Sequence, residues 1–284
     1  MTEREDNDYW PLAVNAASIA LVAVLATHVF HESCHAIATV MVGARLEWVS
    51  FWFGIQYAPV AGMNRWGEIV IASPASLMNI LTGIIAVALF SRRWIMRRPT
   101  LRLFLLYFST YSLLDGFGYL VMDVLVQQPG EQNMGDWARV LDLLDGSQAL
   151  RIAMGLVGAI GGLWAYFWLT HSTLRFGEEV TDRSQRRKLA AALLMIPYLA
   201  TNTILTALSF WHPLGITDSL MLVLHWFTYI IFFLACLDLG LWRKVKTPPC
   251  DATPLPLQPN WPWRVGAVVA LGTTVAVLLP TIYF

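Results

Sequence analysis

The sequence predicts an all-α polytopic membrane protein with about seven transmembrane helices, and a membrane-embedded β-hairpin as a candidate element between the first and the second. Hydrophobic residues make up 57% of the 284 residues, and the mean hydropathy is +0.55. Charged residues make up only 13%, about half the share found in a typical soluble domain. Seven apolar segments also reach the roughly 20 residues that a helix needs to cross a bilayer.

These spans divide the chain into two parts. The first three belong to residues 1–130, which carry the unusual polar motifs, and the last four belong to residues 131–284. The acidic N-terminal stretch lacks the basic region and cleavage site of a signal peptide, so we expect the first span to be retained as an anchor. The spans are expected near residues 12–42, 69–91, 102–126, 150–171, 189–211, 214–242 and 263–283.

Lys and Arg are distributed unequally between the two sides of this arrangement. Of the nineteen, four fall on one side, and they are Arg45, Arg65, Arg139 and Arg151. Because cytoplasmic loops carry the excess of positive charge, we expect a multi-pass protein of the cell membrane with a cytoplasmic N-terminus. No basic run is interleaved with aromatic residues as a nucleic-acid surface requires. The expected partners are therefore the lipid bilayer and other membrane proteins, not nucleic acid.

The first span contains the motif H-E-x-x-H, formed by His31, Glu32 and His35. The two histidines are one helical turn apart on the same face, so both can bind one metal ion with the glutamate beside it. Ionisable residues are rare inside membrane spans and are usually functional. The motif is typical of zinc hydrolysis, in which one Zn²⁺ per chain lowers the pKa of a bound water and Glu32 accepts the proton. The alternative is a cluster of structural histidines.

Other ionisable residues in the spans are candidates for the rest of the site. His28 lies on the same face, and we favour a hydrogen bond to a ligand or a place along a water path, since a fourth protein nitrogen would displace the catalytic water. The third ligand is expected among the carboxylates of the third span. Asp115 lies near the middle of that span, where an unpaired aspartate would be costly. Asp123, two turns later, is the alternative.

H-E-x-x-H in the first span and Leu114-Asp115-Gly116 in the third resemble the site-2 protease family of intramembrane zinc metalloproteases, over roughly residues 25–125. The resemblance implies that Asp115 is the third zinc ligand. It also implies a hairpin between the first two spans, and residues 45–62 are aromatic and β-branched enough to form one. The family's longer N-x-x-P-x-x-x-x-D-G pattern is absent before Asp115.

The stretch "ASPASLMN", residues 72–79, is similar to the G-P-x-x-N element of the family, with Ser73 in place of the glycine. By that resemblance Asn79 positions the substrate or polarises the scissile carbonyl. A hydrogen bond between two helices is the alternative role. Further along, residues 135–150 alternate apolar and acidic side chains at helical spacing, which is typical of an interfacial helix capping the site or of a solvated connector.

The resemblance implies that residues 1–130 are a catalytic core and that the protein is a zinc metallopeptidase. Its reaction would be hydrolysis of a peptide bond in or near a transmembrane segment of a membrane protein substrate, with Glu32 as general base. The alternative is a non-proteolytic metal-binding protein that binds or scaffolds transmembrane helices, although a binder has no need of Glu32. The last four spans carry no second motif, and a regulatory membrane partner that binds them is a further expectation.

Overall fold

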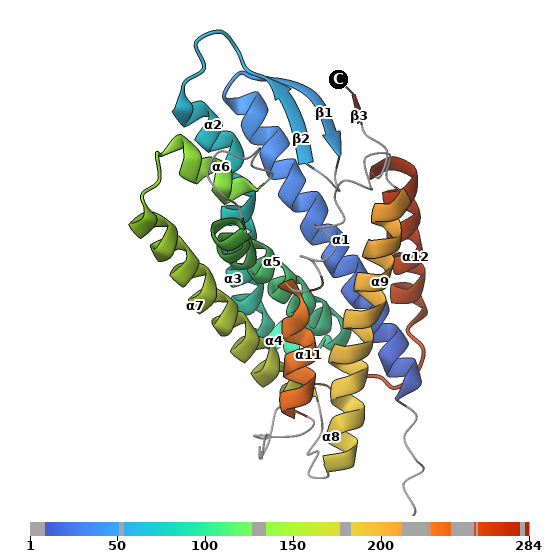
Figure 1. Cartoon of the computed structure of the whole chain (residues 1–284). Coiled ribbons are helices and arrows are strands. Elements are labelled where there is room, and N and C mark those ends of the chain that lie inside the picture. Colours follow the sequence, from blue (N-terminus) through green and yellow to red (C-terminus); the bar gives the residue numbers. More distant parts are fainter. Residues whose placement is uncertain are drawn as a thin grey trace, which may run out of the picture.

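The chain forms a bundle of long helices that carries a small β-sheet at one end, seen in the computed structural model of Figure 1. The longest described helix, α1 (Trp10–Met41), crosses the bundle diagonally and contacts α3, α5, α9 and α12. The structure describes residues 9–50, 54–126, 135–176, 183–211, 226, 228–239, 253, 255–278 and 282–283.

Helix α1 owes its central place to a sequence of small and branched apolar residues. Ala16, Ile19, Ala20 and Ala23 are fully buried, because alanines let neighbouring helices approach closely. The helix ends at Met41, and the chain then turns at Gly43, whose φ of +78° favours glycine. This turn sends the chain directly into the first strand.

The sheet has three antiparallel strands in the order β2-β1-β3. Strands β1 (Arg45–Ser50) and β2 (Gly54–Ala58) form the hairpin that the sequence predicts after the first span, with an irregularity between Leu46 and Trp48. The short strand β3 (Ile282–Tyr283) pairs with the other edge of β1, at Trp48 and Val49. The hairpin is thus present where it was expected, and its depth in a membrane remains a prediction.

The second predicted span is divided into two helices. Helix α2 (Arg65–Ala72) begins at Asn64, whose side chain accepts hydrogen bonds from two backbone N–H groups of the first turn. Helix α3 (Pro74–Phe90) follows after Ser73, since Pro74 has no N–H to continue the ladder of α2. The short α4 (Arg93–Met96) then leads into α5 (Pro99–Val126), which packs closely on α3 and α7.

The second half of the chain supplies one cap and several long helices. Helix α6 (Asp136–Leu143) is short and contacts α2 and α5 at the sheet end of the bundle. The remaining described helices are α7 (Gln148–Thr173) with the 3₁₀ turn η1 (Leu174–Phe176), α8 (Arg183–Ala190), the π-helical turn η2 (Ala191–Met195), α9 (Ile196–Trp211), α11 (Ile230–Leu237), α12 (Trp261–Thr273) and the π-helical turn η4 (Thr274–Leu278).

Four helical segments are long and apolar enough to cross a membrane, which makes this a membrane protein of mainly α-helical architecture. They are Trp10–Met41, Arg65–Phe90, Gln148–Phe176 and Arg183–Phe210. The predicted third span coincides with α5, which is 28 residues long but is not among the four. Most of the predicted sixth span lies outside the described residues, and the seventh overlaps α12. Seven spans therefore remain a prediction.

Helix α8 and the start of α1 lie at the end of the bundle opposite the sheet (Figure 1). There Arg264 Nε donates to Asn15 Oδ1 over 2.9 Å, and Arg102 Nη1 donates to the carbonyl of Arg175 over 3.4 Å. The compartment that this end faces remains a prediction.

Candidate metal centre

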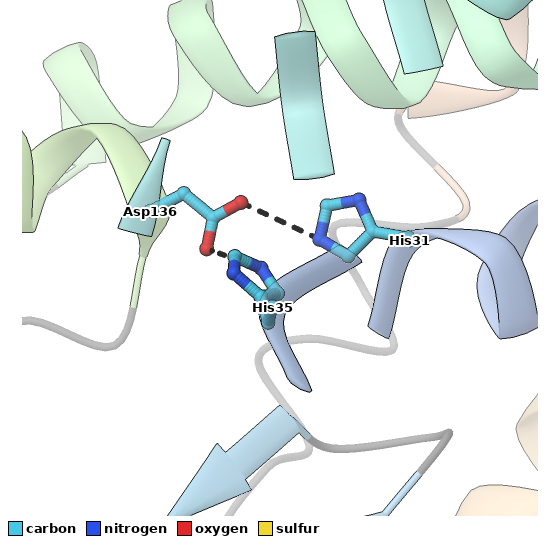
Figure 2. Close-up of side chains that lie close together, drawn as sticks. All are labelled: His31, His35 and Asp136. Carbon is cyan, nitrogen blue, oxygen red and sulfur yellow. Dashed lines mark ion pairs between the residues drawn. The ribbon is translucent and has the colours of Figure 1, made fainter. Parts of the chain in front are cut away.

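The two histidines of the H-E-x-x-H motif point the same way from α1 and meet a carboxylate from α6 (Figure 2). His31 Nε2 lies 3.4 Å from Asp136 Oδ2, and His35 Nε2 lies 3.1 Å from Asp136 Oδ1. One ligand atom of each residue lies within 4.8 Å of the others, and both histidines are buried. This group of two imidazoles and one carboxylate could hold a metal ion.

Asp136 is the residue that the sequence interpretation missed. It is the first residue of α6, inside the segment 135–150 for which a cap over the site was one of two readings. The structure places this segment over the histidines, with Ser76 Oγ of α3 donating to Asp136 Oδ2 over 3.0 Å. In the sequence, an aspartate at a helix start looks like any capping residue. The acidic cap segment was the only available signal.

Asp136 is held ionised by its partners. Burial alone would raise the pKa of its carboxyl group, but the adjacent His35 and His31 outweigh burial and lower the pKa well below its usual range. The start of α6 adds to this effect, because the N-terminal end of a helix favours negative charge. A carboxylate in this state is a suitable metal ligand.

The outward-facing nitrogens of the two rings also have partners. His35 Nδ1 lies 2.8 Å from the carbonyl oxygen of Ile71, so this nitrogen carries a proton, and Nε2 is the nitrogen that faces Asp136. His31 Nδ1 lies 3.1 Å from the side-chain amide of Asn79, which is fully buried on α3. Asn79 thus joins two helices at the site and contacts a candidate ligand directly.

Glu32 projects into the same region from α1. It lies close enough to His31, His35 and Asp136 to interact electrostatically with all three. Its Oε2 atom is shielded from solvent and has no hydrogen-bond partner among the described residues. A buried polar atom left without a partner usually marks a bound water, an ion or a catalytic role.

The other predicted site residues lie nearby but outside the group of three. Asp115 is buried on α5, and its Oδ1 accepts a hydrogen bond of 2.6 Å from Tyr229 Oη. Asp123, also buried, accepts from the backbone N–H of Trp137 over 2.8 Å. His28 is half-buried one turn before His31. The structure therefore brings Asp136, and neither Asp115 nor Asp123, against the histidines, while Asp115 as a ligand remains a prediction of the resemblance.

The group also crosses the boundary drawn from the sequence at residue 130. Two of its members belong to the first part of the chain, and Asp136 belongs to the second.

Comparisons of the chain with protein-family models, with curated proteins and with solved structures found no significant match. The chemistry of this site is therefore argued from its own geometry.

Proposed function

We propose that the protein is an intramembrane zinc metallopeptidase that hydrolyses a peptide bond in or near a transmembrane segment of a membrane protein. The observation that carries the proposal is the buried group of His31, His35 and Asp136 with Glu32 beside it. Two imidazoles, one carboxylate and an open position are the donor set of catalytic zinc sites. The metal, when bound, supplies Lewis-acid activation of water and of the scissile carbonyl.

The residues of the chain fit the two roles that such a site requires, which are metal binding and proton transfer. The Nε2 atoms of His31 and His35 and the Asp136 carboxylate converge on one point and would hold the ion. Glu32 Oε2, which lacks a partner in the described part of the chain, is placed to accept a proton from water and to return it to the leaving amine. The shielding of the site from bulk water strengthens each of these interactions.

Asn79 is assigned the role of orienting His31. A metal on Nε2 of His31 requires the ring proton on Nδ1, and a proton there needs an acceptor. Asn79 Oδ1 is buried and has no partner among the described residues, so a rotated amide would accept from His31 Nδ1 and satisfy both groups. This role corresponds to the contact between two helices that was the alternative for Asn79, with a consequence for metal binding.

The four membrane-spanning segments support a substrate that is itself in the membrane. A transmembrane helix has its backbone carbonyls in hydrogen bonds, so it must unwind locally before attack. The hairpin lies next to the end of α1 that carries the histidines, and a strand edge is a suitable partner for an extended peptide. We assign the protein to the cell membrane with a cytoplasmic N-terminus, on the Lys and Arg distribution.

The test compares membranes that contain the wild-type chain, Glu32→Gln, or the control Asp238→Asn, whose carboxylate accepts a hydrogen bond from Tyr166 of α7 outside the site. New N-termini of membrane proteins are identified by mass spectrometry in each sample. We expect termini that are present with wild type and Asp238→Asn and absent with Glu32→Gln. Identical termini in all three samples would remove Glu32 as the base. A chain that binds metal but yields no new termini would favour the non-proteolytic alternative.

A further inference from the structure

Asp123 of α5 makes the contact that holds the start of α6. Its Oδ2 accepts a hydrogen bond of 2.8 Å from Trp137 N, and the backbone N–H of Ala138 interacts with the same carboxylate. The first N–H groups of a helix have no partners within the helix and are usually satisfied by a capping side chain. The N-cap of α6 is Gly135, which has no side chain, so the cap comes from a different helix.

The fit between Asp123 and α6 is close. A Cβ atom placed on Gly135 would lie 2.3 Å from Asp123 Oδ1 and 2.4 Å from its Cγ. No side chain can therefore occupy position 135 while the carboxylate stays in place. The absence of a side chain at Gly135 and the hydrogen bond from Trp137 N both indicate that the carboxylate approaches the backbone of α6 directly.

This contact fixes the backbone on both sides of Asp136. Gly135 precedes Asp136 and leaves room for the Asp123 carboxylate. Trp137 follows Asp136 and donates its backbone N–H to that carboxylate. A helix of eight residues is marginal by itself in water, so its position depends on contacts with other elements. Besides Asp123, the contacts near the start of α6 include the hydrogen bond from Ser76 to Asp136 and the ion pair between Arg139 and Glu68 of α2.

We infer that Asp123 is a positioning residue that sets Asp136 in place as the carboxylate ligand of the proposed metal centre. The inference rests on the proposed function, because it assigns Asp123 a role in metal affinity. It also accounts for the burial of Asp123 without making it a ligand, since its Oδ2 is directed at the amides of α6. The distances from Asp136 to both histidines then depend on a residue that touches neither ring.

The first measurement is a Co²⁺ titration of the detergent-purified chain, followed by its visible absorption bands. We expect Asp123→Ala to weaken Co²⁺ binding about 10- to 100-fold, the usual effect of removing a partner that orients a ligand. Asp123→Asn keeps one acceptor oxygen and should lose less. Gly135→Ala should resemble Asp123→Ala. The control Asp142→Ala removes another carboxylate of α6, which pairs with Arg151 of α7, and should bind like wild type.

Two outcomes of the titration would overturn the inference. In one, Asp123→Ala binds Co²⁺ with wild-type affinity and an unchanged spectrum. In the other, Asp123→Ala and Asp123→Asn both abolish binding as completely as His31→Ala, which would make Asp123 a ligand. Size-exclusion profiles and thermal unfolding of each variant show that the chain is folded before the titration is interpreted.

Hydrogen exchange of the metal-free chain tests the placement separately from the metal. We expect the backbone amides of Trp137 and Ala138 to exchange faster in Asp123→Ala than in wild type, with unchanged exchange in α7. Equal exchange at these amides would overturn the inference even if metal binds. A wild-type chain that binds no Co²⁺ would instead contradict the proposed function, and the exchange result would then decide the placement of Asp136 by itself.

Discussion

Asn79 Nδ2 and His31 Nδ1 lie 3.1 Å apart, in a contact between α3 and α1 that is buried from solvent. The contact involves the nitrogen of His31 that does not face Asp136. It therefore controls which ring nitrogen carries the proton. We therefore expect the affinity of the proposed metal centre to depend on an amide that does not touch the metal.

The first prediction concerns that amide. We expect Asn79→Leu to weaken metal binding about 10- to 100-fold, because His31 loses the partner that fixes its protonation. Asn79→Asp keeps an acceptor for the Nδ1 proton and should retain most of the affinity. The measurement is a competition titration with a metal-sensitive dye. Asn202→Leu, which removes a buried amide of α9 that donates to the Tyr198 carbonyl, is the control. Equal affinities for Asn79→Leu and wild type would show that His31 needs no such partner.

The second prediction separates the two candidates for the third ligand. Asp136 lies against both histidines, whereas Asp115 bonds Tyr229, so metal should be lost from Asp136→Ala and largely kept in Asp115→Ala. Metal content per chain is measured by inductively coupled plasma mass spectrometry on purified protein, with His31→Ala as the metal-free reference. The same spectra identify the metal, since other divalent ions accept these ligands. The opposite pattern would assign the ligand to Asp115.

The third prediction concerns the stability of α11 against α5. Tyr229→Phe removes the hydroxyl that donates to the buried Asp115, and the carboxylate then lacks this partner. Leaving a buried charged group without its partner costs about 1–3 kcal/mol of unfolding free energy, sometimes more. Tyr166→Phe is the matched control, because its hydroxyl donates to the half-buried Asp238 and should be worth less. Thermal unfolding in detergent compares the two variants, and an equal loss in both would contradict the expectation.

The fourth prediction uses two neighbouring glycines of α7. A Cβ atom on Gly161 would lie 2.2 Å from the ring of Phe117 on α5, whereas one on Gly162 would have nothing within 4 Å. Gly161→Ala should therefore force the two helices apart and cost about 1–3 kcal/mol. Gly162→Ala should leave stability unchanged or slightly higher, since alanine favours helix. Unfolding measurements on both variants would contradict this packing if the two alanines behaved alike.

The sequence predicted the elements whose signal is local. The apolar run of the first span matches α1, and the aromatic and β-branched stretch after it matches the hairpin β1–β2. The break between α2 and α3 was missed, although Pro74 was visible, because hydropathy alone runs through it. Arg102 is the first residue of the predicted third span, and the structure buries it with its guanidinium 4.5 Å from the Phe90 ring. A cation held over aromatic rings cannot be recognised from its sequence neighbours.

The candidate site was predictable only in part, because one of its members comes from a distant part of the sequence. His31, Glu32 and His35 follow one another on a single helix, so their spacing alone predicts that they act together. Asp136 reaches them through the fold of α5 and α6, and no spacing rule relates it to the histidines. Asp115 and Asp123 were found because they are buried carboxylates in an apolar segment, but their hydrogen-bond partners decided their orientation.

The separation of the histidines from Asp136 along the chain has a consequence for biosynthesis. His31 and His35 leave the ribosome long before Asp136 is made, and α3 and α5 are made between these events. During that interval the histidines have no carboxylate to complete the group. Loading of the metal is therefore expected to be a late step, after α6 has closed over the end of α1. A translation intermediate stalled before residue 136 should remain metal-free, and it would therefore lack the proposed peptidase activity.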